Sequence, residues 1–287
     1  MSLPVSLVQT LEDQFSWKIH AAHPVGGGCI HHAHRIETTS GTFFLKYNQA
    51  ARFDQFEVEA KGLAKLASTQ EIATPEVIAK GVGGSHAYLL LRWIERAPQA
   101  PHYWTDFGTK LARLHLHTAP AFGLNHDNYI GSLPQSNTMT DNWSAFFNEQ
   151  RLEPLIRMAD RQGFFSENDR KRFRNLMQRM EDFFPKEKPA LLHGDLWGGN
   201  ILTDEKGEVV ILDPAVYYGH REMELAFMTM FDHQPNSFYE AYEAIYPLEY
   251  AWQERITLCN LYPLLVHLNL FGRSYLPSIQ ASLRRFS

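Results

Sequence analysis

The chain of 287 residues has only two cysteines, no apolar run as long as a membrane-spanning helix and no excess of basic residues. Two cysteines are too few for a small secreted domain held together by disulfides, and a chain of this length can bury a substantial core without them. The first fifteen residues also lack the basic and apolar regions of a signal peptide. We therefore expect a globular protein of the cytoplasm.

The charge balance and the most apolar segment exclude two further classes. The net charge of -5 provides no basic field that would attract nucleic acid or an anionic membrane. The segment 256–271 is strongly apolar, but it contains Asn260, Pro263 and Asn269 and is shorter than the roughly 20 residues that a membrane span needs. It predicts a buried helix, and neither a nucleic-acid nor a membrane partner is expected.

The first third of the chain alternates between helical and strand patterns. Residues 5–16 repeat apolar side chains at helical spacing, and 53–68 do the same with Phe56, Leu63 and Leu66. Between them, two alternating aromatic-rich runs flank the polar turn "TTSG" and predict a β-hairpin. Two more strands are expected within 75–94, around a glycine-rich turn.

The rest of the chain is mostly helical, as 104–118 and 166–184 indicate. The stretch "LLHGDLWGGNIL", 191–202, is predicted to lie in a β-hairpin inserted among the helices, because short apolar strands surround the turn "DEKG" that follows it. The predicted class is α+β, with a small β-rich N-terminal lobe, 1–93, that has one internal helix, and a larger, mainly helical C-terminal lobe, 94–287.

A glycine-rich segment precedes the first strand of the hairpin. Gly26, Gly27 and Gly28 would let backbone N–H groups approach phosphates closely, although three glycines before a strand more often mark a simple turn. Cys29 follows directly, and N–H groups around it could lower the pKa of its thiol. Oxidation there could block nucleotide binding or link two chains; the alternative is a small unreactive residue packed beneath the loop.

Lys46 lies within the apolar strand "FFLKY". If its side chain points inward it needs a carboxylate partner, and an ion pair to the next helix would direct it at the α- and β-phosphates of a nucleotide. If it points outward, it is an ordinary lysine of an edge strand. Glu59 fits the inward face of that helix better than Glu57, but both partners remain open.

Two further motifs complete a pattern that phosphoryl transfer requires. His193, Asp195 and Asn200 have the spacing H-x-D-x-x-x-x-N of a kinase catalytic loop, in which the aspartate accepts the proton of the substrate hydroxyl and the asparagine binds magnesium. Asp213 ends the apolar strand "VVILD", and the hairpin would return it beside Asn200. Two oxygen ligands side by side indicate a Mg²⁺ site for bound ATP.

With these motifs in place, the chain resembles the fructosamine (ketosamine) kinase family, within the protein-kinase-like superfamily of small-molecule phosphotransferases. The resemblance implies a two-lobed fold with ATP held at a hinge formed by the backbone of Arg92, Trp93 and Ile94. It also implies transfer of the γ-phosphate to the 3-hydroxyl of a sugar attached to an amine, which makes the adduct labile and reverses glycation. The segments that carry it span nearly the whole chain: "GGGCI", "FFLKYN", "LARLH", "FGLNHDNYIGSLPQSN", "HGDLWGGN" and "DPAVYYGHREMELA".

The matching motifs also imply roles for single residues. Asp195 resembles the family's catalytic base, and Asn200 and Asp213 resemble its magnesium ligands. Lys46 resembles the phosphate-binding lysine, and Glu59 resembles the partner of that lysine. This chain departs from the family after "GGGCI", where it has two histidines, 31 and 32, in place of a small polar residue.

Three residues are candidates for the acceptor side of the site. Trp197, inside the catalytic-loop motif, would pack against the sugar or the amine, or else cover the core beneath the loop. Tyr217 would line the acceptor side or belong to the core. Glu224 stands where the family often has an aspartate, and we expect it to brace the loop.

Two other functions compete with ketosamine phosphorylation. The same fold could phosphorylate an aminoglycoside, choline or another amino alcohol, because acceptor choice is not encoded in the motifs. A non-catalytic nucleotide-binding regulator is disfavoured, since Lys46, Asp195, Asn200 and Asp213 are all present. The sequence leaves open which sugar–amine adduct is preferred, whether it is free or protein-bound, and whether the protein is a monomer or a homodimer.

Overall fold

The structure is a computed structural model that describes residues 3–26 and 30–287. Contacts divide the chain into two compact units, which are described separately: one contains the residues up to 103 together with 199–214, and the other contains 104–198 and 215–287. The division predicted from the sequence, 1–93 and 94–287, consists of contiguous lobes, whereas neither compact unit is contiguous.

The first unit is built on a five-stranded antiparallel sheet with the order β1-β2-β3-β5-β4. The helix at 5–16, the hairpin, the helix at 53–68 and the two strands within 75–94 are confirmed, but the sequence analysis missed strand β1. The elements are α1 (Val5–Phe15), β1 (Ile19–Pro24), β2 (His32–Thr38), β3 (Gly41–Gln49), η1 (Ala50–Arg52), α2 (Phe53–Ala67), β4 (Val77–Gly83) and β5 (His86–Arg92).

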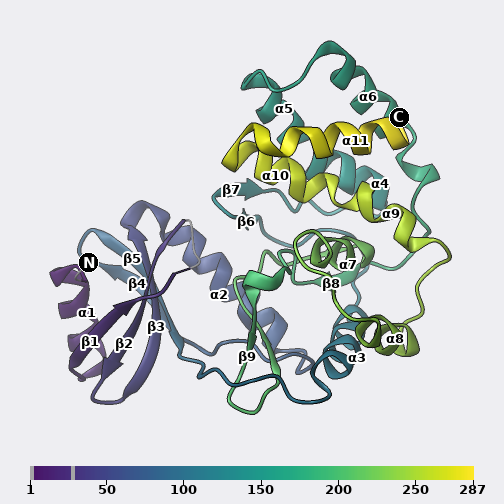
Figure 1. The fold of residues 1–287 in the computed structure, drawn as a ribbon. Helices are drawn as coiled ribbons and strands as arrows, with labels where there is room; N and C mark the ends of the chain where they lie inside the picture. The colour runs from purple at the N-terminus through teal and green to yellow at the C-terminus, as the bar shows by residue number, and fades with distance from the viewer. Residues whose placement is uncertain (1–2, 27–29) are drawn as a thin grey trace. The chain divides into compact units, whose positions relative to one another are not determined.

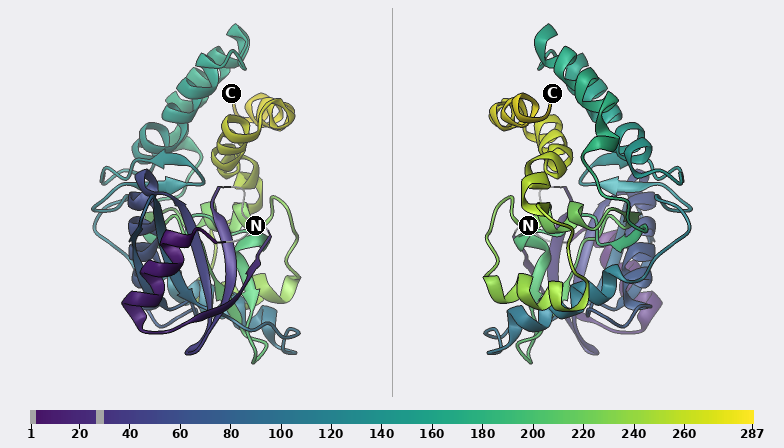
Figure 2. Two further views of the ribbon diagram at one scale, coloured as in Figure 1. Left: turned by 90° about the vertical axis from the view of Figure 1, so that its left-hand side faces the viewer. Right: turned by 90° about the vertical axis from the view of Figure 1, so that its right-hand side faces the viewer.

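The two helices cover opposite faces of this sheet (Figures 1 and 2). Leu7 and Leu11 of α1 pack with Leu45 and Tyr47 of β3. On the other face, α2 packs against β5 in a separate apolar cluster that includes Phe56 and Leu89. Because successive strand residues point to opposite faces, Lys46 of β3 points to the side of α2.

A hairpin from much later in the chain completes the first unit. Strands β9 (Ile201–Thr203) and β10 (Val209–Ile211) pair antiparallel around the turn "DEKG". The backbone N–H of Ile211 donates to the carbonyl of Ala73, and that of Ala100 donates to the carbonyl of Gly207. These bonds attach the hairpin to the sheet unit, although about a hundred residues separate it from β5.

The predicted placement of 191–202 inside a hairpin is wrong. Strand β8 (Ala190–Leu192) pairs with β11 (Tyr217–Gly219), whereas β9 pairs with β10. The stretch therefore links two separate two-stranded sheets, and its centre is a loop that ends in the 3-10 turn η4 (Gly198–Asn200). Apolar patterning indicates that short strands exist, but it does not specify their partners.

The second unit is mainly helical, with a core that includes Trp143, Phe146, Leu192 and Leu265. This helical part, together with the antiparallel sheet of the first unit, confirms the predicted α+β class. Its other elements are α3 (Tyr103–His115), β6 (Asn128–Ile130), β7 (Leu133–Gln135), α4 (Trp143–Phe146), the π-helix η2 (Phe147–Leu152), α5 (Glu153–Arg161), α6 (Glu167–Gln178), η3 (Met180–Asp182), α7 (Glu222–Met228), α8 (Asn236–Ile245), α9 (Trp252–Cys259), α10 (Leu261–Phe271), η5 (Arg273–Tyr275) and α11 (Leu276–Phe286).

The apolar segment 256–271 is buried as predicted, but it forms parts of two helices, α9 and α10, that meet at Asn260. Pro263 lies in the first turn of α10. Backbone N–H groups there have no partner within the helix, so the N–H that proline lacks costs no helical hydrogen bond. Across the residues that the structure describes, no helix combines the length and apolarity needed to cross a membrane.

The crossing of α3 and α8 in the second unit depends on Gly108. A Cβ at this position would overlap the backbone carbonyl of Phe238 in α8. We expect Gly108→Ala to lower the free energy of unfolding by about 1–2 kcal/mol, because overpacking outweighs the better helix propensity of alanine. Urea denaturation measures this. The exposed α3 control Thr105→Ala should change it by less than about 0.5 kcal/mol, and equal effects of both variants would contradict the packing argument.

Candidate active site

Lys46 is the centre of a charged cluster in the first unit. Its side chain is 7% exposed, and its Nζ lies 2.8 Å from Oε1 of Glu59 in α2 and also contacts Oδ1 of Asp213. Glu57, the other candidate partner, instead forms ion pairs with Lys61 and Lys80. The register of α2 explains the choice, because Glu59 lies beside the buried residues of the helix, whereas the side chain of Glu57 is the more exposed of the two.

Burial and charge act in opposite directions within this cluster. Burial favours the neutral form of Lys46, but the charges and hydrogen bonds of Asp213 and Glu59 outweigh it and keep the pKa of Lys46 above its ordinary value. Burial raises the pKa of Glu59 to about 7, although Lys46 opposes that rise. One buried cation thus faces two carboxylates, of which that of Asp213 is the more exposed.

Asn200 and Asp213 are brought together by the β9–β10 hairpin, as the sequence analysis expected. The backbone N–H of Leu212 donates to the carbonyl oxygen of Asn200 at 3.0 Å, and Asp213 is the next residue, with a φ of 58°. Mg²⁺ usually takes one or two protein oxygen ligands and completes its shell with phosphates and water. The amide and carboxylate oxygens of this pair fit such an ion.

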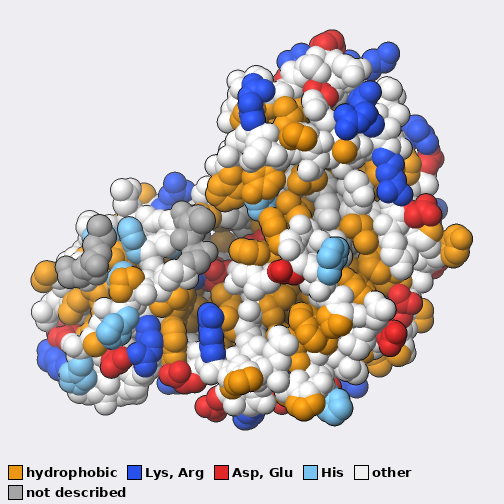
Figure 3. All heavy atoms as spheres, viewed as in Figure 1, with side chains coloured by type: hydrophobic (Ala, Val, Ile, Leu, Met, Phe, Trp, Pro, Cys, Tyr) orange, Lys and Arg blue, Asp and Glu red, His pale blue; other side chains and the backbone are white. Residues whose placement is uncertain are grey.

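No cluster of three or more His, Cys, Asp and Glu side chains arranged to hold a metal occurs within 3–26 and 30–287. The histidine side chains on the face shown in Figure 3 form separate patches.

The predicted hinge and glycine-rich loop also belong to the first unit. Arg92 ends β5, and its guanidinium lies 3.0 Å from the carboxylate of Glu76. Trp93, just before Ile94, has its ring 5.4 Å from the guanidinium of Arg35. Of the loop residues, Gly26 has open space at its Cβ position. The other three predicted residues of the loop, Gly27, Gly28 and Cys29, lie outside the described residues.

The loop that carries Asp195 belongs to the second unit. Gly194 has a φ of 85°, and a Cβ there would overlap the carbonyl oxygen of Ala215, so only glycine fits. The backbone N–H of Ala215 donates to the carbonyl of His193, and the N–H of Asp195 donates to Nδ1 of the same histidine at 3.2 Å. Asp195 itself is partly exposed.

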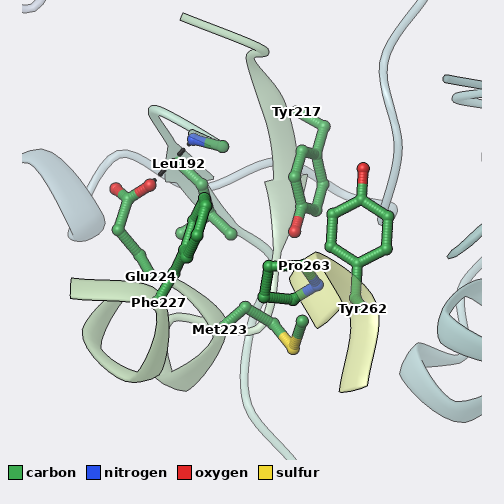
Figure 4. Close-up of a pocket in the computed structure, with 8 residues that line it drawn as sticks. Leu192, Tyr217, Met223, Glu224, Phe227, Tyr262 and Pro263 are labelled. Atoms are coloured by element: carbon green, nitrogen blue, oxygen red, sulfur yellow. Dashed lines mark hydrogen bonds between the residues drawn. The ribbon is translucent and has the colours of Figure 1, made fainter. Parts of the chain in front are cut away.

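Glu224 braces this loop from α7. Its carboxylate accepts a hydrogen bond from the backbone N–H of Gly194 at 2.8 Å (Figure 4) and another from that of His193 at 3.0 Å. It also lies 3.1 Å from Nε2 of His115. Burial alone would raise the pKa of Glu224, but these donors outweigh it and hold the pKa below its ordinary value. The side chain of Glu224 is fully buried, so it supports the loop rather than reaching an acceptor.

Sequence reasoning missed two members of this network. His115 and Tyr242 are buried, and Nδ1 of His115 lies 2.7 Å from the hydroxyl of Tyr242. In a neutral His115 ring that donates from Nε2 to Glu224, Nδ1 accepts from the hydroxyl of Tyr242. The helical periodicity of "LARLH" places His115 on the buried face of α3. Periodicity alone does not distinguish a histidine that only fills the core from one that holds a catalytic loop in position.

The other acceptor-side candidates differ in exposure. Trp197 is partly exposed, and its ring centroid lies 5.5 Å from that of Phe231. Tyr217 is buried beneath the guanidinium of Arg151, and burial raises the pKa of its hydroxyl to about 12. It borders a cavity of about 10 Å³ together with Glu224 (Figure 4). This space suits a single water molecule rather than a substrate.

The raised pKa of Glu59 predicts a specific pH dependence of stability. Between pH 4.5 and 7 the folded protein retains a proton on Glu59 that the unfolded chain has lost, so stability should fall as pH rises, by on the order of 2 kcal/mol. Urea denaturation without nucleotide or magnesium measures this, and Glu59→Gln should remove that component. Glu57→Gln, on the same helix, should retain it. A Glu59→Gln curve parallel to that of the wild type would contradict the assignment.

The hydrogen bonds around Glu224 predict that replacing its carboxylate by an amide lowers the stability of the protein. In Glu224→Gln an amide NH₂ would replace one oxygen and face a donor of the loop or of His115, leaving a buried group unpaired. We expect a loss of about 2–3 kcal/mol in the free energy of unfolding. The control is Glu240→Gln on the exposed side of α8, which should change little. If both variants match the wild type, Glu224 does not brace the loop.

Comparison with known proteins shows which family the chain is similar to. Residues 4–286 match the family model described as fructosamine kinase. A "Probable ketoamine kinase" of Synechocystis is 38% identical over 284 residues, which cover 96% of each chain. The "Protein-ribulosamine 3-kinase, chloroplastic" of Arabidopsis thaliana is 38% identical over 262 residues, covering 88% of this chain and 78% of its own length.

A solved structure from Haemophilus somnus, described as a "Putative fructosamine-3-kinase", superposes with a TM-score of 0.87 at 28% identity, covering 98% of this chain and 96% of that chain. The fold is thus that of the kinase-like phosphotransferases, and the family model covers both compact units. The resemblance inferred from the motifs is confirmed: the chain belongs to the fructosamine kinase family.

Proposed function

We propose that this protein is an ATP-dependent kinase that phosphorylates the 3-hydroxyl of ketosamines, the fructosamine and ribulosamine adducts of amines. The observation that carries the proposal is the buried Lys46, paired with Glu59 and in contact with Asp213, in a chain that also has the H-x-D-x-x-x-x-N motif. Relatives named as ketoamine and ribulosamine kinases support the acceptor class.

In this proposal the first unit binds Mg²⁺ and ATP. Lys46, held in place by Glu59, contacts the α- and β-phosphates, while Asn200 and Asp213 provide oxygen ligands to magnesium. When bound, the ion would neutralise charge on the phosphate oxygens. The backbone of Arg92, Trp93 and Ile94 binds the adenine, and the loop that starts at Gly26 binds the phosphates.

The second unit provides the proton acceptor. Asp195 accepts a hydrogen bond from the sugar hydroxyl and orients it for attack on the γ-phosphate. Glu224 fixes the backbone on the N-terminal side of Asp195, so the carboxylate is presented from a loop with little freedom. Trp197, which is partly exposed two residues later, contacts the sugar or the amine.

Phosphorylation of the 3-hydroxyl makes the sugar–amine bond labile, so the reaction would release the free amine and repair glycation. The composition, with two cysteines and a net charge of -5, supports a role in the cytoplasm without nucleic-acid or membrane partners. We infer a monomer or a homodimer acting on free or protein-bound adducts. An aminoglycoside or choline acceptor, and a regulator without activity, are not favoured by the names of the relatives.

The test of this function is Asp195→Asn. Its turnover with magnesium, ATP and a fructosamine or ribulosamine should fall by roughly 10²–10⁴, because general-base catalysis is lost, while ATP binds about as well as in the wild type. Phosphate transfer and calorimetric ATP binding are measured in parallel. Asp141→Asn, at an exposed position of the second unit, is the control and should keep both.

The acceptor panel should include aminoglycosides and choline. Phosphorylation of one of these in place of the ketosamines would reject the proposed substrate class. ATP binding without any transfer would favour a regulator, and wild-type turnover in Asp195→Asn would remove this residue from the mechanism.

A further inference from the structure

His31 and His32 are adjacent in sequence but lie on opposite sides of the sheet in the first unit. The ring of His31 packs against Phe56 of α2, with 4.6 Å between centroids. The ring of His32 stacks on Tyr47, at 5.0 Å, and Tyr47 belongs to the apolar cluster on the face covered by α1. Since Lys46 pairs with Glu59 of α2, His31 shares its face of the sheet and His32 does not.

Asn48 determines which nitrogen of His31 carries a proton. The Oδ1 of Asn48 accepts a hydrogen bond from the backbone N–H of Gln49 at 2.8 Å, and its Nδ2 donates to the carbonyl of Ile30 at 3.0 Å. These two bonds allow only one orientation of the amide. Its second N–H then lies 3.1 Å from Nδ1 of His31, which must accept, so in the neutral ring the proton is on Nε2.

The Nε2–H group of His31 is a donor without a partner among residues 3–26 and 30–287. The residue is partly exposed, so a ligand can reach it. The ring is neutral at neutral pH, because burial and then the charge of Lys46 lower its pKa to about 4, with Asp213 opposing them. The charged groups that act on it most strongly are thus the two that would bind phosphate and magnesium in the proposed function.

We propose that His31 is a phosphate-binding residue, whose Nε2–H group donates a hydrogen bond to an oxygen of the phosphate chain of the nucleotide. The proposal rests on the proposed function, because it takes the nucleotide site to lie at Lys46. A neutral donor suits this place, since it bonds a phosphate oxygen without adding a positive charge beside Lys46 and a bound magnesium ion. The hydrogen bond from Asn48 and the contact with Phe56 fix the orientation of the His31 ring before the nucleotide binds.

The test compares His31→Phe with the matched control His32→Phe. Phenylalanine keeps a ring against Phe56 but has no N–H group. Calorimetry with magnesium should show that His31→Phe binds ADP about tenfold to a hundredfold more weakly, with adenosine binding unchanged, because only ADP carries phosphates. His31→Gln, which restores an N–H donor, should recover part of the ADP affinity, and His32→Phe should bind both ligands as the wild type does.

The binding measurements distinguish a wrong role for His31 from a wrong assignment of the protein as a kinase. Wild-type affinity for ADP in His31→Phe, or an equal loss for ADP and adenosine, would overturn the role of His31 and leave the kinase proposal intact. A wild-type protein that binds neither ATP nor ADP would overturn both.

A second measurement does not depend on the folding of a variant. Nitrogen-15 NMR of the histidine rings of the wild-type protein at pH 7.5 should show His31 neutral with its proton on Nε2, and addition of magnesium and ADP should shift that nitrogen. A proton on Nδ1, or no shift at saturation, would overturn the proposal.

Discussion

A buried ammonium group is stable only beside carboxylates, and this requirement at Lys46 organises the first unit. Its partners come from α2 and from a hairpin 167 positions away in the chain. The same contact that compensates the charge places Asp213, and with it Asn200, beside the sheet. The groups proposed to bind phosphate and metal are therefore assembled by one electrostatic constraint, and not by three separate motifs.

The second unit contains a buried carboxylate, Glu224, which is stable only if hydrogen-bond donors surround it. Glu224 is stabilised by two backbone N–H groups and by His115. The two backbone donors lie just before Asp195, so the interactions that keep Glu224 ionised also hold the loop in one conformation. Gly194 makes this possible, because its positive φ and the close carbonyl of Ala215 exclude any side chain.

Several features were predicted correctly because local patterns carry them. The register of α2 was enough to favour Glu59 over Glu57, and the "DEKG" turn was enough to bring Asn200 beside Asp213. Other features have no local signal. Strands of three residues such as β6 and β7 are too short for alternation to show, and the break at Asn260 lies within a strongly apolar segment that predicts one continuous helix.

The sequence by itself determined the order, spacing and chemical type of the candidate groups, because these are properties of neighbouring residues. It also determined the class of fold, through the change from alternating to helical periodicity. Only the tertiary structure decided that β8 pairs with β11, that His115 and Tyr242 support Glu224, and that His31 and His32 face opposite sides of the sheet. Each of these depends on contacts between residues far apart in the chain, and the free energy of such contacts leaves no trace in the local pattern.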